Sequence, residues 1–141
     1  MANTVLLHSA LVCGLIHTLA ASLLRPPPLF HCVLLLGVFS SIYNHAVTSV
    51  WAVWCDRFVM CVGFVADSVY ADGDWLVVRA GVTLSALLYL AGKISRNNPK
   101  KLGQFLSGRQ EQDSDHFHLS SHILLTCTHL WMLVRLSGVS I

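Results

Sequence analysis

Charged side chains are scarce in this chain of 141 residues, in which 9 Lys and Arg and 7 Asp and Glu make up 11% of the total. Soluble domains carry about 25%. Hydrophobic residues reach 55%, which is more than one small core can enclose with water on every side. The sequence therefore excludes a soluble globular protein and indicates an integral membrane protein. The few basic residues form no basic stripe, which excludes nucleic acid as a partner.

The cysteines also show no spacing pattern that would indicate disulfide bonds. The number of cysteines is odd, they lie in apolar surroundings, and no two of them form a C-x-x-C motif. A disulfide-rich scaffold and a soluble metal-binding cysteine module are both excluded. We expect reduced, buried thiols at Cys13, Cys32, Cys55, Cys61 and Cys127.

Long uncharged runs define the predicted helices. Val5 to Leu24 is a run of 20 residues without a charge, which is the length that crosses about 30 Å of hydrocarbon. Backbone groups in lipid must be paired within their own segment, so such runs should be helices. We expect one all-α transmembrane domain over residues 1–141, with a turn at Asp72–Asp74 and a polar loop at about 93–115. Its five helices are predicted at about Val5–Leu24, Leu29–Val47, Trp54–Tyr70, Trp75–Gly92 and Phe117–Gly138.

Helix parity predicts the orientation in the membrane. Successive spans alternate in direction, so the amino terminus shares one side with the junction of the second and third helices and with the polar loop. Six of the nine Lys and Arg residues fall on that side: Arg57, Lys93, Arg96, Lys100, Lys101 and Arg109. By the positive-inside rule this side is cytoplasmic.

Histidines lie near the helix ends on that shared side. His118 and His122 are spaced i, i+4, which stacks them on one face of the last helix, and His45 ends the second helix. Three neutral imidazoles at about 2.0 to 2.1 Å would leave the fourth position of a tetrahedral zinc ion open to water, as in catalytic zinc sites. The sequence therefore predicts a Zn²⁺ site formed by His45, His118 and His122.

Two further polar residues complete the predicted centre. We expect Asp56 in the first turn of the third helix, where a carboxylate is favoured by unpaired backbone N–H groups. From there Asp56 could take a proton from water at the metal, and Ser41, one turn before His45, could orient that water or donate to a developing oxyanion.

Simpler interpretations stay open for each of these residues. His116 could replace His118, although two residues along a helix point about 200° apart and only one can share a face with His122. The three histidines could form a polar network without metal. Asp56 could only cap its helix, and Ser41 could only allow close helix packing. The remaining histidines are interpreted as packing or interfacial residues bonded to carbonyls: His8, His17, His31 and His129.

The motifs together resemble a known superfamily. The segments Ser41-Ile42-Tyr43-Asn44-His45 and His118-Leu119-Ser120-Ser121-His122, with Asp56 between them, look like the signature of the CREST membrane hydrolases. That superfamily includes alkaline ceramidases, progestin and adiponectin receptors and hemolysin III proteins. Its members usually have seven helices, so this chain resembles a shortened version, with a thinner cavity wall or one completed by a second copy of the chain.

The resemblance implies a zinc-dependent hydrolase that cleaves an amide or ester of a membrane lipid, either a sphingolipid or a phospholipid. It assigns the metal to His45, His118 and His122 and catalysis to Asp56 and Ser41. Two alternatives remain: a non-catalytic membrane receptor or scaffold that keeps the polar cluster, and an electron carrier with a b-type haem between histidines.

Overall fold

The computed structural model describes residues 4–71, 75–97 and 110–138, and these residues form five helices without a strand. The predicted turn at 72–74 lies outside the described residues. The helices are α1 (Thr4–Leu24), α2 (Pro28–Ala46), α3 (Val50–Tyr70), α4 (Trp75–Asn97) and α6 (Gln110–Leu136). The all-α fold and the number of helices are confirmed for the described part of the chain.

Within the described ranges, three helices are long and apolar enough to cross a membrane: α1, α2 and the Leu76–Ser95 part of α4. The other two carry more polar groups, since α3 contains Asp56, Arg57 and Asp67 and α6 contains four histidines. Large apolar side chains point away from the bundle, such as Leu23, which is 80% exposed, and Trp51, which is 79% exposed. The protein is therefore a helical membrane protein.

The helix boundaries differ from the prediction at the polar ends. The predicted loop at 93–115 is wrong at both edges: Lys93–Asn97 continues α4 and Gln110–Asp115 opens α6, while 98–109 lies outside the described residues. Polar residues can extend a helix beyond the hydrocarbon, where hydropathy gives no signal. α3 begins at Val50, four residues before its predicted start, directly after the extended residue Ser49.

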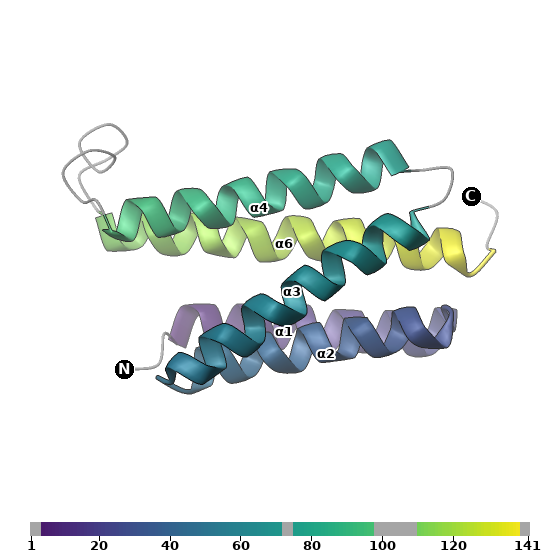
Figure 1. Cartoon of the computed structure of the whole chain (residues 1–141), viewed down its shortest axis with the longest axis horizontal. Coiled ribbons are helices and arrows are strands. Elements are labelled where there is room, and N and C mark those ends of the chain that lie inside the picture. The colour runs from purple at the N-terminus through teal and green to yellow at the C-terminus, as the bar shows by residue number, and fades with distance from the viewer. Residues whose placement is uncertain (1–3, 72–74, 98–109, 139–141) are drawn as a thin grey trace.

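The helices form a ring in the order α1, α2, α3, α4, α6, with α6 packed back on α1. α4 and α6 lie antiparallel along one side of the bundle, α1 and α2 lie along the other, and α3 crosses between the two pairs (Figure 1). Among neighbours in the ring, α4 and α6 have the most extensive contact and α3 and α4 the least extensive. This ring surrounds the site described below.

Small residues bring α4 and α6 close together. A Cβ atom at Gly81 would collide with Thr128, and one at Gly92 would lie 3.0 Å from the carbonyl oxygen of Ser114. Ser85 Oγ donates to the carbonyl oxygen of Ser121 at 2.9 Å. Close approach of backbones and serine hydrogen bonds are the usual basis of helix packing in membranes.

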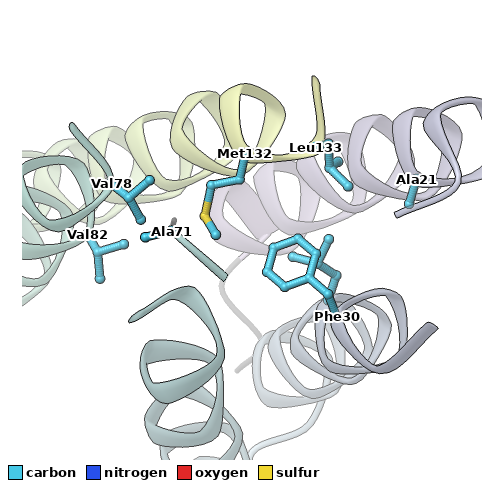
Figure 2. Packing of buried hydrophobic residues seen from close by; sticks show 8 residues of the cluster. Ala21, Phe30, Ala71, Val78, Val82, Met132 and Leu133 are labelled. Atoms are coloured by element: carbon cyan, nitrogen blue, oxygen red, sulfur yellow. The ribbon is translucent and has the colours of Figure 1, made fainter. Parts of the chain in front are cut away.

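The apolar core lies at the end of the bundle away from the amino terminus (Figure 2). Phe30 and Leu133 are fully buried there, where the end of α1 and the start of α2 meet the end of α6. The cluster comprises Ala21, Phe30, Leu34, Ala71, Val78, Val82, Met132 and Leu133. The opposite end of the bundle is left for polar side chains.

All five cysteines are free thiols, as the sequence predicts. Their predicted burial is wrong for four of them, because Cys32, Cys55, Cys61 and Cys127 are exposed and only Cys13 is partly buried. Apolar surroundings in a membrane protein include the lipid-facing surface, so an apolar sequence context does not distinguish the two locations.

Candidate metal centre

Three histidines meet at the polar end of the bundle. The end of α2 and the start of α6 lie at the same end as the amino terminus (Figure 1), which brings His45 against His118 and His122. Ring centroids are 5.1 Å apart for His45–His118, 5.4 Å for His45–His122 and 4.9 Å for His118–His122. One ligand atom from each ring lies within 4.8 Å of the others. We call these three residues the triad.

The alternative ligand His116 is separated from this group. His116 is exposed, whereas His118 and His122 are partly buried and His45 is buried. Two residues along α6 place His116 on a different face from His118. The structure thus brings His118 together with His45 and His122 and leaves His116 on the surface.

Ser9 of α1 orients His122. Its hydroxyl donates to the carbonyl oxygen of Leu6 at 2.8 Å and lies 2.9 Å from His122 Nδ1. A hydroxyl has one proton, so towards His122 it acts as the acceptor and Nδ1 carries the hydrogen. The lone pair of His122 is then on Nε2. An outer partner of this kind on the second ring nitrogen is typical of metal-binding histidines.

A tyrosine and a lysine lie beside the triad. The Tyr89 ring packs edge-on against His118, with centroids 5.0 Å apart. Lys93 Nζ lies 5.5 Å from the centroid of the Tyr89 ring on the next turn of α4. A cation is therefore held at the polar end of the bundle, next to the triad.

Asp56 is held by α2 and does not cap its own helix. It is the seventh residue of α3, so its predicted position in the first turn is wrong. Its Oδ1 accepts a hydrogen bond from Ser40 Oγ at 3.1 Å, and its Oδ2 accepts one from Asn44 Nδ2 at 2.8 Å. The carboxylate is 6% exposed. Asp56 lies beyond the first turn because α3 begins four residues earlier than predicted.

Ser41 lies beside this contact without joining it. Ser40, and not Ser41, donates to Asp56. Ser41 lines the same cavity as Asp56, His118 and His122. Its predicted part in catalysis remains a prediction.

The cavity inside the ring has a volume of about 510 Å³. Most of its wall is apolar, and Met60 and Phe64 of α3 belong to it although they are 41% and 52% exposed. Ala86 of α4 also lines it and is exposed. Exposed lining residues thus lie on both α3 and α4, the two neighbours with the weakest contact in the ring, which indicates that the cavity opens between these helices.

The sequence interpretation missed a second polar cluster on this cavity. His17 and His129 were expected to be packing residues without matched partners, but they lie 3.0 Å apart through Nε2 and Nδ1, and Asp67 is 3.2 Å from His129 Nε2. The expectation of a carbonyl partner is correct for His17, which bonds Cys13. His129 follows His122 by seven residues and Asp67 follows Asp56 by eleven. Both intervals return to nearly the same helix face, which is the signal that could have found them.

The donor set fits a small divalent cation. A tetrahedral zinc ion with bonds of about 2.05 Å needs ligand nitrogens about 3.4 Å apart, which the limit of 4.8 Å admits. The three rings contact one another with centroids no more than 5.4 Å apart, two pairs edge-on and one pair tilted, which leaves no space for a planar macrocycle between any two of them. The arrangement favours a single ion over haem.

Neither a protein-family model, nor a curated protein, nor a solved structure matches this chain.

Proposed function

We propose that the protein is a zinc-dependent membrane hydrolase that cleaves an amide or ester bond of a lipid. The observation that carries this proposal is that His118 and His122 of the triad line a cavity that is mostly apolar and is also lined by Asp56. The resemblance of the three motifs to the CREST hydrolases adds to it.

The triad and Asp56 have different parts in the proposed chemistry. His45, His118 and His122 would hold zinc, which supplies Lewis-acid polarisation of a carbonyl and acidifies water. Asp56 would take a proton from water and return it to the leaving group, and the hydrogen bonds from Ser40 and Asn44 hold its carboxylate in place for this.

The substrate would enter from the bilayer. Acyl chains suit the apolar part of the cavity wall, and a head group would lie near Lys93 and Tyr89 at the polar end of the bundle. We place this end of the bundle on the cytoplasmic side, because six of the nine Lys and Arg residues gather there in the predicted topology.

A lipid panel with one conservative variant tests the proposal. Purified protein in bilayers is offered a ceramide, a glyceride ester and a phospholipid, and released fatty acid is measured. We expect Asp56→Asn to keep its zinc while hydrolysis falls about 10²- to 10⁴-fold, the contribution of a general base. Full activity in Asp56→Asn would remove Asp56 from the mechanism. Stoichiometric zinc without turnover of any lipid would favour the non-catalytic receptor or scaffold.

A further inference from the structure

The second polar cluster joins three helices in the interior of the bundle. It consists of His17 on α1, Asp67 on α3 and His129 on α6, which are 8%, 5% and 9% exposed. We call these three residues the relay. Ionisable groups inside a membrane are costly to insert and are by default candidates for function.

The hydrogen bonds of the relay form one continuous chain. His17 Nδ1 lies 2.8 Å from the carbonyl oxygen of Cys13, and His17 Nε2 lies 3.0 Å from His129 Nδ1. His129 Nε2 lies 3.2 Å from Asp67 Oδ2. This series of hydrogen bonds begins at the carbonyl oxygen of Cys13, which can only accept, and ends at the carboxyl group of Asp67.

Counting protons along this chain gives a definite result. Three hydrogen bonds need three hydrogens, and two neutral imidazoles supply two. An ionised carboxylate supplies none. One further proton must therefore be present, on His17, on His129 or on Asp67, and in each case the net charge of the cluster is zero.

We propose that the relay is a proton-binding site that holds one exchangeable proton, and that it forms a second acid–base centre on the cavity of the triad. His17, Asp67 and His129 all line that cavity together with Asp56. His129 follows His122 by two helical turns, which is about 10.5 Å along α6. A proton leaving the relay would pass to water or ligand in the cavity, and one returning would restore the neutral cluster.

The ionisable groups that act on His17 belong to the relay itself. The charged or titratable groups that act on His17 are His129 and Asp67. The cavity residues of α2 nearest to this end are apolar, such as Leu34 and Gly37, and α4 contributes Val82. The other titratable groups on the cavity belong to the triad end or are thiols: Asp56, Tyr89, His118, His122, Cys13 and Cys61.

The geometry favours a proton over a metal ion at the relay. Only two ring nitrogens face each other, and the third group, Asp67, bonds the opposite nitrogen of His129. Within the part of the chain that the structure describes, the triad is the group of three ligand atoms that could surround an ion.

Nitrogen NMR of histidine-labelled protein in bilayers tests the proposal. Among the eight histidines, we expect the third proton of the relay either on one ring, with both of its nitrogens protonated or sharing the proton, or on the Asp67 carboxyl group hydrogen-bonded to His129, and its signal should be lost in Asp67→Asn. Asp56→Asn is the matched control, because it makes the same change on the same face of α3, and it should keep the signal. An unchanged signal in Asp67→Asn would overturn the proposal.

The wild-type protein alone also decides the question if Asp67→Asn does not fold. Carboxyl-labelled aspartate together with the ring signals reports the proton count directly: an ionised Asp67 beside two neutral rings would contradict the proposal. A second equivalent of metal that is bound by the wild type and absent from His17→Gln would overturn it in favour of a metal. Loss of zinc from the triad, by contrast, leaves the expected relay signal unchanged.

Discussion

The triad and the relay use the same side chain in opposite ways. In the triad, three rings pack against one another and their ligand atoms converge within 4.8 Å. In the relay, ring nitrogens are used up in hydrogen bonds to each other, to a carbonyl and to a carboxyl group. A cation needs converging lone pairs, whereas a proton needs a donor and an acceptor in line. The comparison shows that the partners of a buried histidine, and not the histidine itself, decide what it can bind.

Removal of metal should give the largest difference between the two clusters, because it affects the triad and not the relay. We expect a chelator to abolish lipid hydrolysis and added zinc to restore it, because the Lewis acid is lost and returned. The relay signal should stay the same throughout, because no ring of the relay is a ligand. Hydrolysis that continues after complete removal of metal would contradict the difference in function between the triad and the relay.

Packing between α4 and α6 supports both clusters, and Gly81 tests it. We expect Gly81→Val to destabilise the fold by about 1 to 3 kcal/mol, the usual cost of overpacking, because the added atoms collide with Thr128, the neighbour of His129. Thermal unfolding in detergent measures the effect. Gly63→Ala is the control, since a Cβ there meets nothing within 4 Å. Equal unfolding temperatures for the two variants would contradict the packing described.

Ser9 should affect the triad alone and to a smaller degree. We expect Ser9→Ala to weaken zinc binding about 10- to 100-fold, as outer-shell changes do, because His122 Nδ1 loses its acceptor. Competition with a zinc indicator measures the affinity. Thr18→Ala on the same helix is the matched control, because its hydroxyl donates to the carbonyl oxygen of Gly14 in its own helix. Equal affinity in both variants would show that Ser9 does not orient the ring.

The sequence predicts the helices and the triad better than the relay, because the triad is marked by local signals in the chain. The helices and the meeting of His45 with His118 and His122 follow from local signals: uncharged runs, the break at Pro26–Pro28 and an i, i+4 pair at a helix end. These signals depend on neighbours in the chain. The boundaries of α3, α4 and α6 were less accurate, because polar residues continue a helix outside the hydrocarbon without changing its periodicity.

Helix spacing places His129 on the face of His122 and Asp67 on the face of Asp56, but the pairing of His17 with His129 and the contact of Ser9 could not be predicted in this way. His17 and His129 are 112 residues apart, and Ser9 and His122 are 113 apart. Their contacts depend on α6 packing back against α1, which no local pattern specifies. Asp67 is a single polar residue near the end of a stretch of α3 that is otherwise mostly apolar. The choice of Ser40 over Ser41 as the donor to Asp56 depends on the rotation of α2 against α3.

The measurement that tests the central claim most directly is the zinc content of purified protein. We expect one zinc ion per chain in the wild type, none in His122→Ala, and one in His129→Gln, because His122 belongs to the triad and His129 to the relay. Equal zinc content in His122→Ala and the wild type would contradict the assignment of the metal to the triad.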